Sequence, residues 1–142
     1  MKKNFRLEVV TPERLFYSGD IELVIVKTNS GEEGFMAGHT WAVKLLQPGQ
    51  LRIQEKDEDR QNMKYAAISE GYIVVEDNVT IFTDAAEWPE EIDLARAERA
   101  KERAESRLKQ ISLDDIEHAR LEIALHRAIN RIRVKGGNHH LK

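Results

Sequence analysis

The chain has 142 residues, of which 33% are charged and 6% aromatic, with a mean hydropathy of -0.55 and a formal net charge of -3. These values are typical of a soluble, charge-rich chain of one domain or two small ones, and the negative charge argues against a general nucleic-acid binder. The sequence contains no cysteine, which excludes disulfides, thiolate chemistry and zinc–thiolate sites.

The apolar residues of this chain occur in short runs. No run approaches the roughly 20 apolar residues that a membrane-spanning helix needs. The first residues, Met1 to Asn4, lead into alternating residues rather than an apolar stretch, so we expect no signal peptide. A cytoplasmic protein is therefore the default expectation.

The first part of the chain alternates in hydrophobicity and turns often. Residues 5–9 alternate between apolar and charged side chains, which predicts a strand with one buried face. Residues 21–26 and 41–46 are richer in apolar side chains and predict strands covered on one or both faces. Two hairpins are predicted, one with a polar tip at 55–62 and one that turns at 76–78. We expect two packed sheets, an antiparallel β-sandwich of about ten strands.

After residue 84 the hydrophobic period changes from two to that of a helix. Trp88 precedes Pro89, a pair that disfavours helix at Trp88 and suits the start of a helix soon after. Apolar residues, mostly alanine, then recur at steps of three and four and predict one helical stripe. The stripe comprises Ala97, Ala100, Ala104, Leu108 and Ile111.

A second helix is predicted to follow the S-x-x-D pattern of residues 112–115, which is typical of a helix N-terminus. Glycines at 136–137 end it. The residues expected near its apolar face are Ile116, Ala119, Ile123, Ala128 and Ile132. The expected fold is therefore α+β with the two classes segregated. Residues 1–87 form the sandwich, and residues 88–142 form an antiparallel helical hairpin with a short disordered tail containing His139 and His140.

The hairpin is expected to be only marginally stable. An alanine seam lets two helices approach closely but buries little apolar area, and about 50 residues rarely hold together through a core alone. The pair should therefore need to dock, either on the sandwich or on another protein. A marginal element with two docking options has the properties of a switch.

Six motifs spread over nearly the whole chain are similar to those of one family. They are, in order, 9–12 (VVTP), 31–39 (GEEGFMAGH, against G-E-x-G-I-x-P-G-H), 68–75 (ISEGYIVV, against S-G-G-x-x-E-V), 77–80 (DNVT), 92–97 (IDLARA, against I/L-D-x-x-R-A) and 125–132 (LHRAINRI). The chain resembles the epsilon subunit of bacterial F-type ATP synthases. It departs from the family pattern at Ala37, where a proline is usual, at Trp41, where a small apolar segment is usual, and at Glu70, where a glycine is usual.

The resemblance implies a non-catalytic subunit of a rotating central stalk. The sandwich would bind the gamma subunit and the membrane-embedded c-ring, at the cytoplasmic face of the bacterial cell membrane and peripheral to it. The helices would either fold onto the sandwich or extend along gamma to contact the alpha and beta subunits and oppose ATP hydrolysis. Two alternatives remain open: a free-standing ATP-sensing module, and an enzyme with an unrecognised site.

Arg127 and Arg131 lie four residues apart and so share one helix face, while Asp93 and Arg96 lie at the start of the first helix. An antiparallel hairpin brings these ends together, so three guanidiniums could converge on a polyphosphate with Asp93 as an acceptor. The alternative is a solvated charged face.

The resemblance implies that in some members these residues bind ATP and hold the hairpin closed, and it adds Glu87 and Ala97 to the site. ATP is then a regulatory ligand rather than a required cofactor. Magnesium is not implied, since carboxylates are few there.

Four further residues are candidate partner contacts. Arg120 and Arg133 continue the basic stripe of the second helix and would meet acidic residues of the beta subunit in the extended form. Glu32 and His39 lie in a segment expected to be a loop, where they would contact the c-ring or gamma; ordinary loop polarity is the alternative. We find no metal-ligand spacing, P-loop or nucleophile–base pattern.

Overall fold

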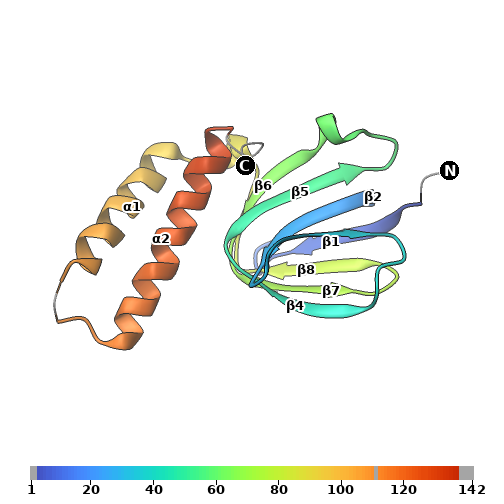
Figure 1. Ribbon diagram of the computed structural model, residues 1–142. Helices are drawn as coiled ribbons and strands as arrows, with labels where there is room; N and C mark the ends of the chain where they lie inside the picture. The colour runs from blue at the N-terminus through green and yellow to red at the C-terminus, as the bar shows by residue number, and fades with distance from the viewer. Residues whose placement is uncertain (1–2, 111, 138–142) are drawn as a thin grey trace.

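The computed structural model describes residues 3–110 and 112–137, in which a β-sandwich is followed by two antiparallel helices (Figure 1). The strands are β1 (Phe5–Val10), β2 (Leu15–Thr28), β3 (Gly31–Met36), β4 (Ala42–Leu46), β5 (Gly49–Glu55), β6 (Lys64–Ile68), β7 (Gly71–Val75), β8 (Val79–Thr83) and β9 (Ala86–Glu87). The helices are the short 3-10 helices η1 (Arg60–Asn62) and η2 (Pro89–Glu91), then α1 (Leu94–Leu108) and α2 (Asp115–Lys135). The segregated α+β fold is confirmed, with nine strands in the described residues where about ten were predicted.

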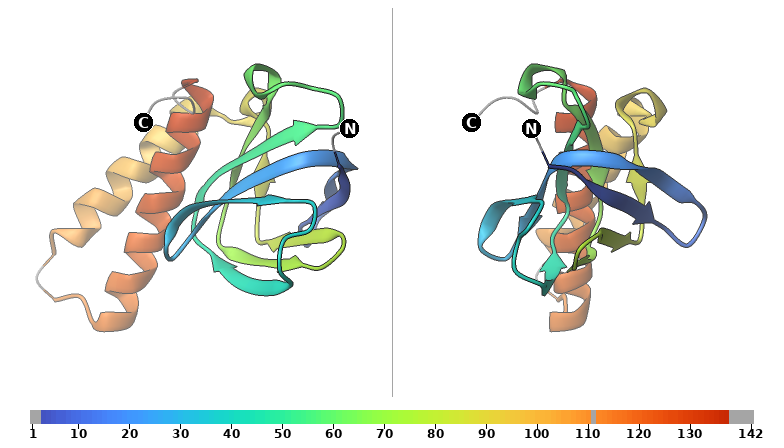
Figure 2. Two further views of the ribbon diagram at one scale, coloured as in Figure 1. Left: turned by 45° about the vertical axis from the view of Figure 1, so that its right-hand side comes forward. Right: turned by 90° about the vertical axis from the view of Figure 1, so that its right-hand side faces the viewer.

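The strands are hydrogen-bonded in the order β1-β8-β7-β4-β2-β5-β6-β9, and β3 pairs with β2. Strand β2 has 14 residues and also pairs with β1, so it runs through both layers of the sandwich. Figure 2 shows the layers facing each other. The pairing of β1 with β8 is parallel, unlike the antiparallel pairing expected. No hairpin turn constrains these two strands, because they come from opposite ends of the sandwich sequence.

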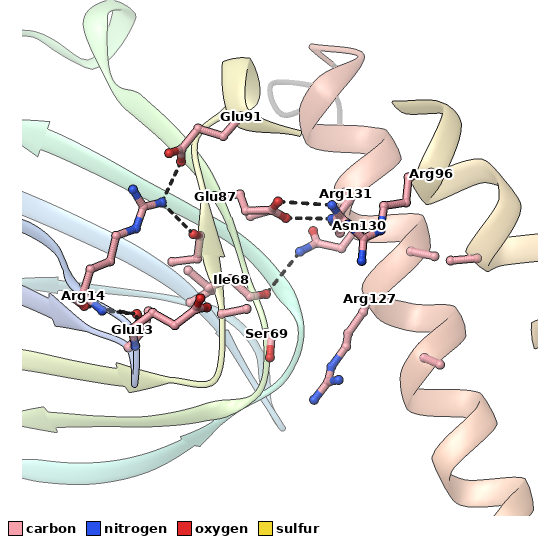
Figure 3. A pocket seen from close by; sticks show the side chains of 17 residues that line it. Glu13, Arg14, Ile68, Ser69, Glu87, Glu91, Arg96, Arg127, Asn130 and Arg131 are labelled. Carbon is pink, nitrogen blue, oxygen red and sulfur yellow. Dashed lines mark hydrogen bonds and ion pairs between the residues drawn. The ribbon is translucent and has the colours of Figure 1, made fainter. Parts of the chain in front are cut away.

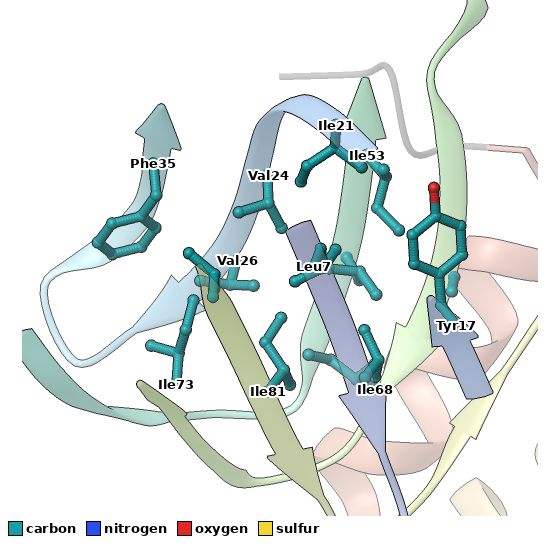
Figure 4. Close-up of a cluster of buried hydrophobic side chains, with 14 of the residues drawn as sticks. Leu7, Tyr17, Ile21, Val24, Val26, Phe35, Ile53, Ile68, Ile73 and Ile81 are labelled. Atoms are coloured by element: carbon teal, nitrogen blue, oxygen red, sulfur yellow. The ribbon is translucent and has the colours of Figure 1, made fainter. Parts of the chain in front are cut away.

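The core lies between the two layers of the sandwich (Figure 4). Alternation along the strands points one set of side chains inward, and Leu7, Ile53 and Ile81 are fully buried. All buried side chains of this core lie between residues 5 and 86, so the sandwich has a core of its own. Trp88 packs against its rim, stacked on Phe16 with ring centroids 4.4 Å apart.

The segment expected to be a loop at residues 31–39 is partly a strand. Residues Gly31–Met36 form β3, which pairs antiparallel with β2 from Thr28 to Leu23. The tight connection depends on Gly31, whose φ of 103° disfavours other residues. Most positions of β3 are polar residues or glycine, so the segment lacks the alternating apolar pattern by which a strand is recognised. Glu32 therefore lies in a strand, and only His39 remains in the loop that follows.

The two long helices begin at aspartates. The Asp93 side chain accepts from the Arg96 amide at the start of α1, and the Asp114 side chain accepts from the Glu117 amide at the start of α2. The cap of α2 is thus Asp114, two residues after the position that the S-x-x-D pattern indicated. Asp114 gives an equivalent cap and leaves Ser112 in the turn.

The predicted helical stripes are only partly buried. Ala97 and Ala104 are buried on α1, as expected, and so is Ala128 on α2. The expected apolar residues of the first half of α2 are exposed instead: Ile116, Ala119 and Ile123. The most deeply buried face of α2 lies near its end, where the helix contacts β5, β6 and η2 as well as α1. Ile111, His139 and His140 lie outside the described residues.

Candidate functional site

A cavity of about 560 Å³ lies between the helical hairpin and the adjacent edge of the sandwich (Figure 3). Its volume falls in the range of pockets that hold small molecules. Side chains from both parts of the fold line it, including Ser69, Glu87, Arg96, Arg127, Asn130 and Arg131. Any ligand of this cavity would therefore contact both the hairpin and the sandwich.

The apolar contact that joins the two parts is small. Ala67 of β6, Ile92 before α1 and Val134 of α2 form a separate buried cluster. Burying Ile92 and Val134 stabilises the docked hairpin by a few kcal/mol at most. Polar contacts therefore have a large share in deciding whether the hairpin stays docked.

Asn130 of α2 makes the most deeply buried polar contact between helix and sheet. Only 8% of the residue is exposed, and its Nδ2 donates to the carbonyl oxygens of Gly49 at 2.8 Å and Ile68 at 3.2 Å. Sequence reasoning gave Asn130 no role. The available signal was its spacing of four from Val134, which places both residues on the buried face of α2.

Two arginines of α2 form paired hydrogen bonds with carboxylates of the sandwich. Arg131 donates from Nε to Glu87 Oε1 at 2.7 Å and from Nη2 to Glu87 Oε2 at 3.1 Å. Arg127 donates from Nε to Glu70 Oε1 at 2.9 Å and from Nη2 to Glu70 Oε2, with Asp84 Oδ2 3.5 Å from the same Nη2. Because bidentate arginine–carboxylate pairs are among the strongest in proteins, both favour docking.

The charge of Glu70 is stabilised by its surroundings. Burial acts to raise the pKa of this carboxyl, but hydrogen bonds from Arg127, its own backbone amide and the Ser69 hydroxyl outweigh burial and hold the pKa below its ordinary value. The hydrogen bond to Glu70 likewise raises the pKa of Arg127. The pair is thus fully charged at neutral pH.

The residues predicted to bind ATP are partly brought together. Glu87, Arg96, Arg127 and Arg131 line the cavity. Arg96 points from α1 toward Arg131 in Figure 3, and its side chain has no hydrogen bond or ion pair to any described residue. The arginines of α2 are not free, since each is paired with a carboxylate.

The other two predicted ATP ligands do not line the cavity. Asp93 caps α1, with Oδ1 3.1 Å from the Arg96 amide nitrogen. Ala97 is fully buried in the seam between the helices.

The predicted partner-contact residues lie apart from the cavity. Glu32 forms an ion pair with Arg52 at 2.6 Å. The His39 ring packs edge-on against Phe35, with its Nδ1 2.8 Å from the Thr40 carbonyl oxygen. Both basic candidates on α2 are exposed: Arg120 and Arg133.

The described part of the chain has neither a helix suited to a membrane nor a cluster of side chains suited to a metal ion. None of its helices has the length and apolar character needed to cross a membrane. It also contains no cluster of three or more His, Cys, Asp or Glu side chains able to hold a metal ion.

The outer face of the sandwich carries an exposed apolar surface that the sequence analysis did not identify. Strand register aligns one apolar residue from each of five neighbouring strands, and we call this the apolar row: Leu45 of β4, Tyr72 of β7, Phe82 of β8, Val10 of β1 and Leu15 of β2. Leu45 is 66% exposed, and the nearby Trp41 and Val43 are 64% and 69% exposed. Only one face of the 41–46 segment is therefore covered.

Comparison with known families accounts for the whole described fold. A family model described as the beta-sandwich domain of the ATP synthase delta/epsilon chain matches residues 4–89, and one described as its long alpha-helix domain matches residues 90–136. The chain belongs to the ATP synthase delta/epsilon family. The family recognised from the sequence motifs is thus confirmed.

Individual members of the family match most of the chain. An ATP synthase epsilon chain of Alkaliphilus oremlandii is 50% identical over 109 residues, which are 76% of this chain and 78% of the relative. An epsilon chain of Caldicellulosiruptor saccharolyticus is 47% identical over 131 residues, 92% of each chain. This epsilon-family chain thus aligns with bacterial epsilon chains over both of its parts.

Solved structures agree. A chain in the structure of the Euglena gracilis mitochondrial ATP synthase, described as OSCP/F1/c-ring in rotational state 1, matches with a TM-score of 0.75 and 28% identity over 89% of this chain and 78% of that one. A chain of the Tetrahymena thermophila mitochondrial ATP synthase has a TM-score of 0.58 at 15% identity over 97% and 98% of the two chains. The second match supports the fold alone.

Proposed function

We propose that this chain is the epsilon subunit in the central stalk of an F-type ATP synthase, where it joins the catalytic head to the c-ring without catalysing a reaction. Its family and the named assembly of its Euglena relative support this role. Held through gamma and the c-ring, it is a peripheral protein at the cytoplasmic face of the cell membrane.

The apolar row is the observation that best supports a stalk role. Contiguous apolar surface exposed on a soluble domain marks an interaction site, and here it extends across five strands with Trp41 and Val43 beside it. The gamma subunit is the proposed occupant of this face. Glu32 and His39, on β3 and in the loop after it, are proposed to contact gamma or the c-ring.

Copurification with the stalk tests this assignment. A tagged chain should recover the gamma subunit, and Leu45→Glu should lose most of it because the new carboxylate would be buried unpaired at the interface. Gln61→Glu is the matched control, since it adds the same charge at an exposed position of η1, away from the row. Recovery of the unmodified chain without gamma or catalytic subunits would instead favour the free-standing sensor.

The helical hairpin is proposed to act as a brake on ATP hydrolysis. Its attachment to the sandwich is through a small apolar cluster, one asparagine and two arginine pairs, so docking depends largely on polar contacts that another partner could replace. Once extended, the helix would present Arg120, Arg127, Arg131 and Arg133 to acidic residues of the catalytic head, with inhibition that weakens as salt increases.

Removing residues 92–142 tests the brake. A reassembled catalytic head containing the shortened chain should hydrolyse ATP faster than one containing the full chain. Unchanged hydrolysis would mean that the hairpin does not inhibit this enzyme.

The cavity is proposed to bind ATP and so favour the docked, non-inhibitory hairpin. Its lining supplies four arginines, Arg14 from the sandwich and Arg96, Arg127 and Arg131 from the hairpin, and of these Arg96 has no partner among the described residues. Guanidinium groups suit phosphate oxygens. The described residues contain no cluster of three or more metal-ligating side chains, and we propose that ATP binds here without magnesium, so binding should persist in EDTA.

Arg96→Ala is the sharpest test of the ATP site. Because the Arg96 side chain forms no hydrogen bond or ion pair with any described residue, its removal should weaken ATP binding by about 10- to 100-fold without changing ligand-free docking. Arg103→Ala, at an exposed position on α1, is the control. Equal ATP binding by both variants, or none by the parent, would refute the site.

A further inference from the structure

Glu70 stands in a rigid connection between two strands and faces the hairpin. The following residue must be glycine, because a Cβ at Gly71 would lie 1.9 Å from the Phe82 carbonyl oxygen. The Glu70 backbone oxygen accepts from the Asp84 amide at 3.2 Å and from the Thr83 hydroxyl at 3.1 Å. The backbone of Glu70 is therefore fixed, and the carboxylate can leave its position only by rotation of the side chain.

The carboxylate occupies the Nε–Nη2 edge of the Arg127 guanidinium. Nε and Nη2 of the guanidinium each donate to a different oxygen of Glu70, and the Ser69 hydroxyl orients the first of these oxygens at 2.9 Å. A phosphate group that binds this edge would use the same two donors, because arginine pairs with carboxylates and phosphates in the same bidentate geometry. Arg127 cannot pair with both anions through this edge at once.

The two other hairpin arginines that line the cavity differ from Arg127 in this respect. Arg96 has no partner among the described residues, and Arg131 pairs with Glu87, which itself lines the cavity. The Glu70 carboxylate lies outside the set of lining residues. A ligand that recruits the Nε–Nη2 edge of Arg127 must therefore displace an anion of the sandwich.

We propose that Glu70 is an internal competitor for the phosphate groups of the ligand: it holds Arg127 when the cavity is empty and is displaced when a nucleoside triphosphate binds. This inference rests on the proposed ATP site. Glu70 thereby has two effects, because it keeps the ligand-free hairpin docked and it raises the ATP concentration needed for binding.

The competition predicts equal and opposite effects of Glu70 on hairpin docking and on ATP affinity. Suppose that the Glu70–Arg127 pair multiplies the equilibrium constant for hairpin docking by some factor. Removing the carboxylate then divides the ligand-free docking equilibrium constant by that factor. The same removal tightens ATP binding to the docked form by that same factor, because the ligand no longer competes. For a partly exposed bidentate pair we expect a factor of roughly 3 to 10. A carboxylate that only stabilised the fold would weaken both properties together.

The experiment measures docking and ATP binding on the same full-length chain. Because the sequence has no cysteine, the substitutions Thr40→Cys and Ser112→Cys allow two labels to be placed on the sandwich and on the hairpin turn, and their separation reports docking. ATP is titrated into the labelled parent, Glu70→Gln and the matched control Glu58→Gln, which removes an equivalent exposed carboxylate from the β5–β6 connection.

Glu70→Gln should dock less than the parent without ligand and, once the docked fraction reported by the labels is taken into account, bind ATP in the docked form roughly 3- to 10-fold more tightly, while Glu58→Gln should match the parent. Arg127→Ala should reduce both docking and ATP binding. Equal or weaker ATP binding by the docked form of Glu70→Gln would overturn the competition while leaving the ATP site intact. No binding by the parent or Glu70→Gln would overturn both the competition and the ATP site.

Discussion

At the scale of single residues, the hairpin is held by groups with different electrostatic character. Asn130 is neutral and buried, whereas Arg127 and Arg131 are charged and remain partly exposed. A buried neutral hydrogen bond is insensitive to salt, while exposed ion pairs are screened. Salt and pH should therefore act on the arginine pairs and leave the Asn130 contact unchanged.

Asn130→Leu should weaken docking of α2 without disrupting the core. The leucine cannot donate to the Gly49 and Ile68 carbonyl oxygens, and we expect a loss of about 1–3 kcal/mol in the free energy of docking. Hydrogen exchange of the α2 amides measures it, since undocking exposes them. Asn62→Leu on η1 is the exposed control. Unchanged exchange would show that the buried amide does not anchor the helix.

The Glu70 carboxyl should titrate below its ordinary pKa of 4.5 in the docked protein. Arg127 from α2 and Asp84 after β8 are the charged groups that face the pair. Because the docked pKa is depressed, the contribution of Glu70 to docking is complete above the ordinary pKa and is lost as the pH falls through the docked value. Carbon-13 NMR of the carboxyl measures this directly, and Arg127→Ala should shift the pKa upward.

The sequence predicts the positions of some cavity residues but not their partners, for physical reasons. Arg96, Arg127 and Arg131 could be brought to one cavity because helix periodicity and an antiparallel turn fix their faces. The partner of Arg127 could not be foreseen, since Glu70 is 57 residues away and meets it only through tertiary packing. Asp93 has a local role as the cap of α1, and its predicted contact with the ligand stays a prediction.

At the scale of elements, the hairpin combines a close seam with a half-covered second helix. Ala97 and Ala104 let the helices approach, and α2 reaches the sandwich only through its last turns. Of the expected stripe of α1, Ala97 and Ala104 are buried, and α2 is the main neighbour of this helix. The stripe of α2 was only partly right, because α2 has two neighbours near its end and one near its start. The hydrophobic periodicity of a helix does not show at which residue the helix begins to contact a second element.

Ala104→Leu should open the helical seam. A larger side chain at a fully packed position costs about 1–3 kcal/mol, because the helices must separate to admit it. Ala95→Leu is the matched control at an exposed position of the same helix. Circular dichroism on heating should show earlier loss of helix in Ala104→Leu alone. Identical melting of the two variants would mean that the seam is loosely packed.

At the scale of the whole molecule, the sandwich is self-sufficient and the hairpin is not. The sandwich core draws on no helical residue, but Trp88, just beyond β9, completes its rim against Phe16. The alternating strands and both predicted hairpins were foreseeable from local pattern. The long path of β2 and the parallel β1–β8 pair were not, since they depend on contacts between distant segments. The proposed division at residues 87 and 88 stays a prediction.

The position at which the chain is shortened should determine the stability of the isolated sandwich. A chain ending at Glu91 keeps Trp88 and should unfold cooperatively. A chain ending at Glu87 loses the tryptophan and should be less stable by about 1–3 kcal/mol. Urea unfolding compares the two. Equal stabilities would show that the stacking of Trp88 on Phe16 contributes nothing to the sandwich.

The attachment of α2 by its last turns also has a mechanical consequence. From Asp115 to Arg127 the helix rises about 18 Å, so a push on the turn between the helices acts on the contacts through a lever arm. Such a force meets the Arg127 pair first, then Asn130, then the Arg131 pair and finally Val134. Contacts that break in sequence need a lower peak force than contacts that break together. A small force applied at the turn between the helices should therefore detach α2 one contact at a time. A force along the helix axis loads the same contacts together and meets more resistance.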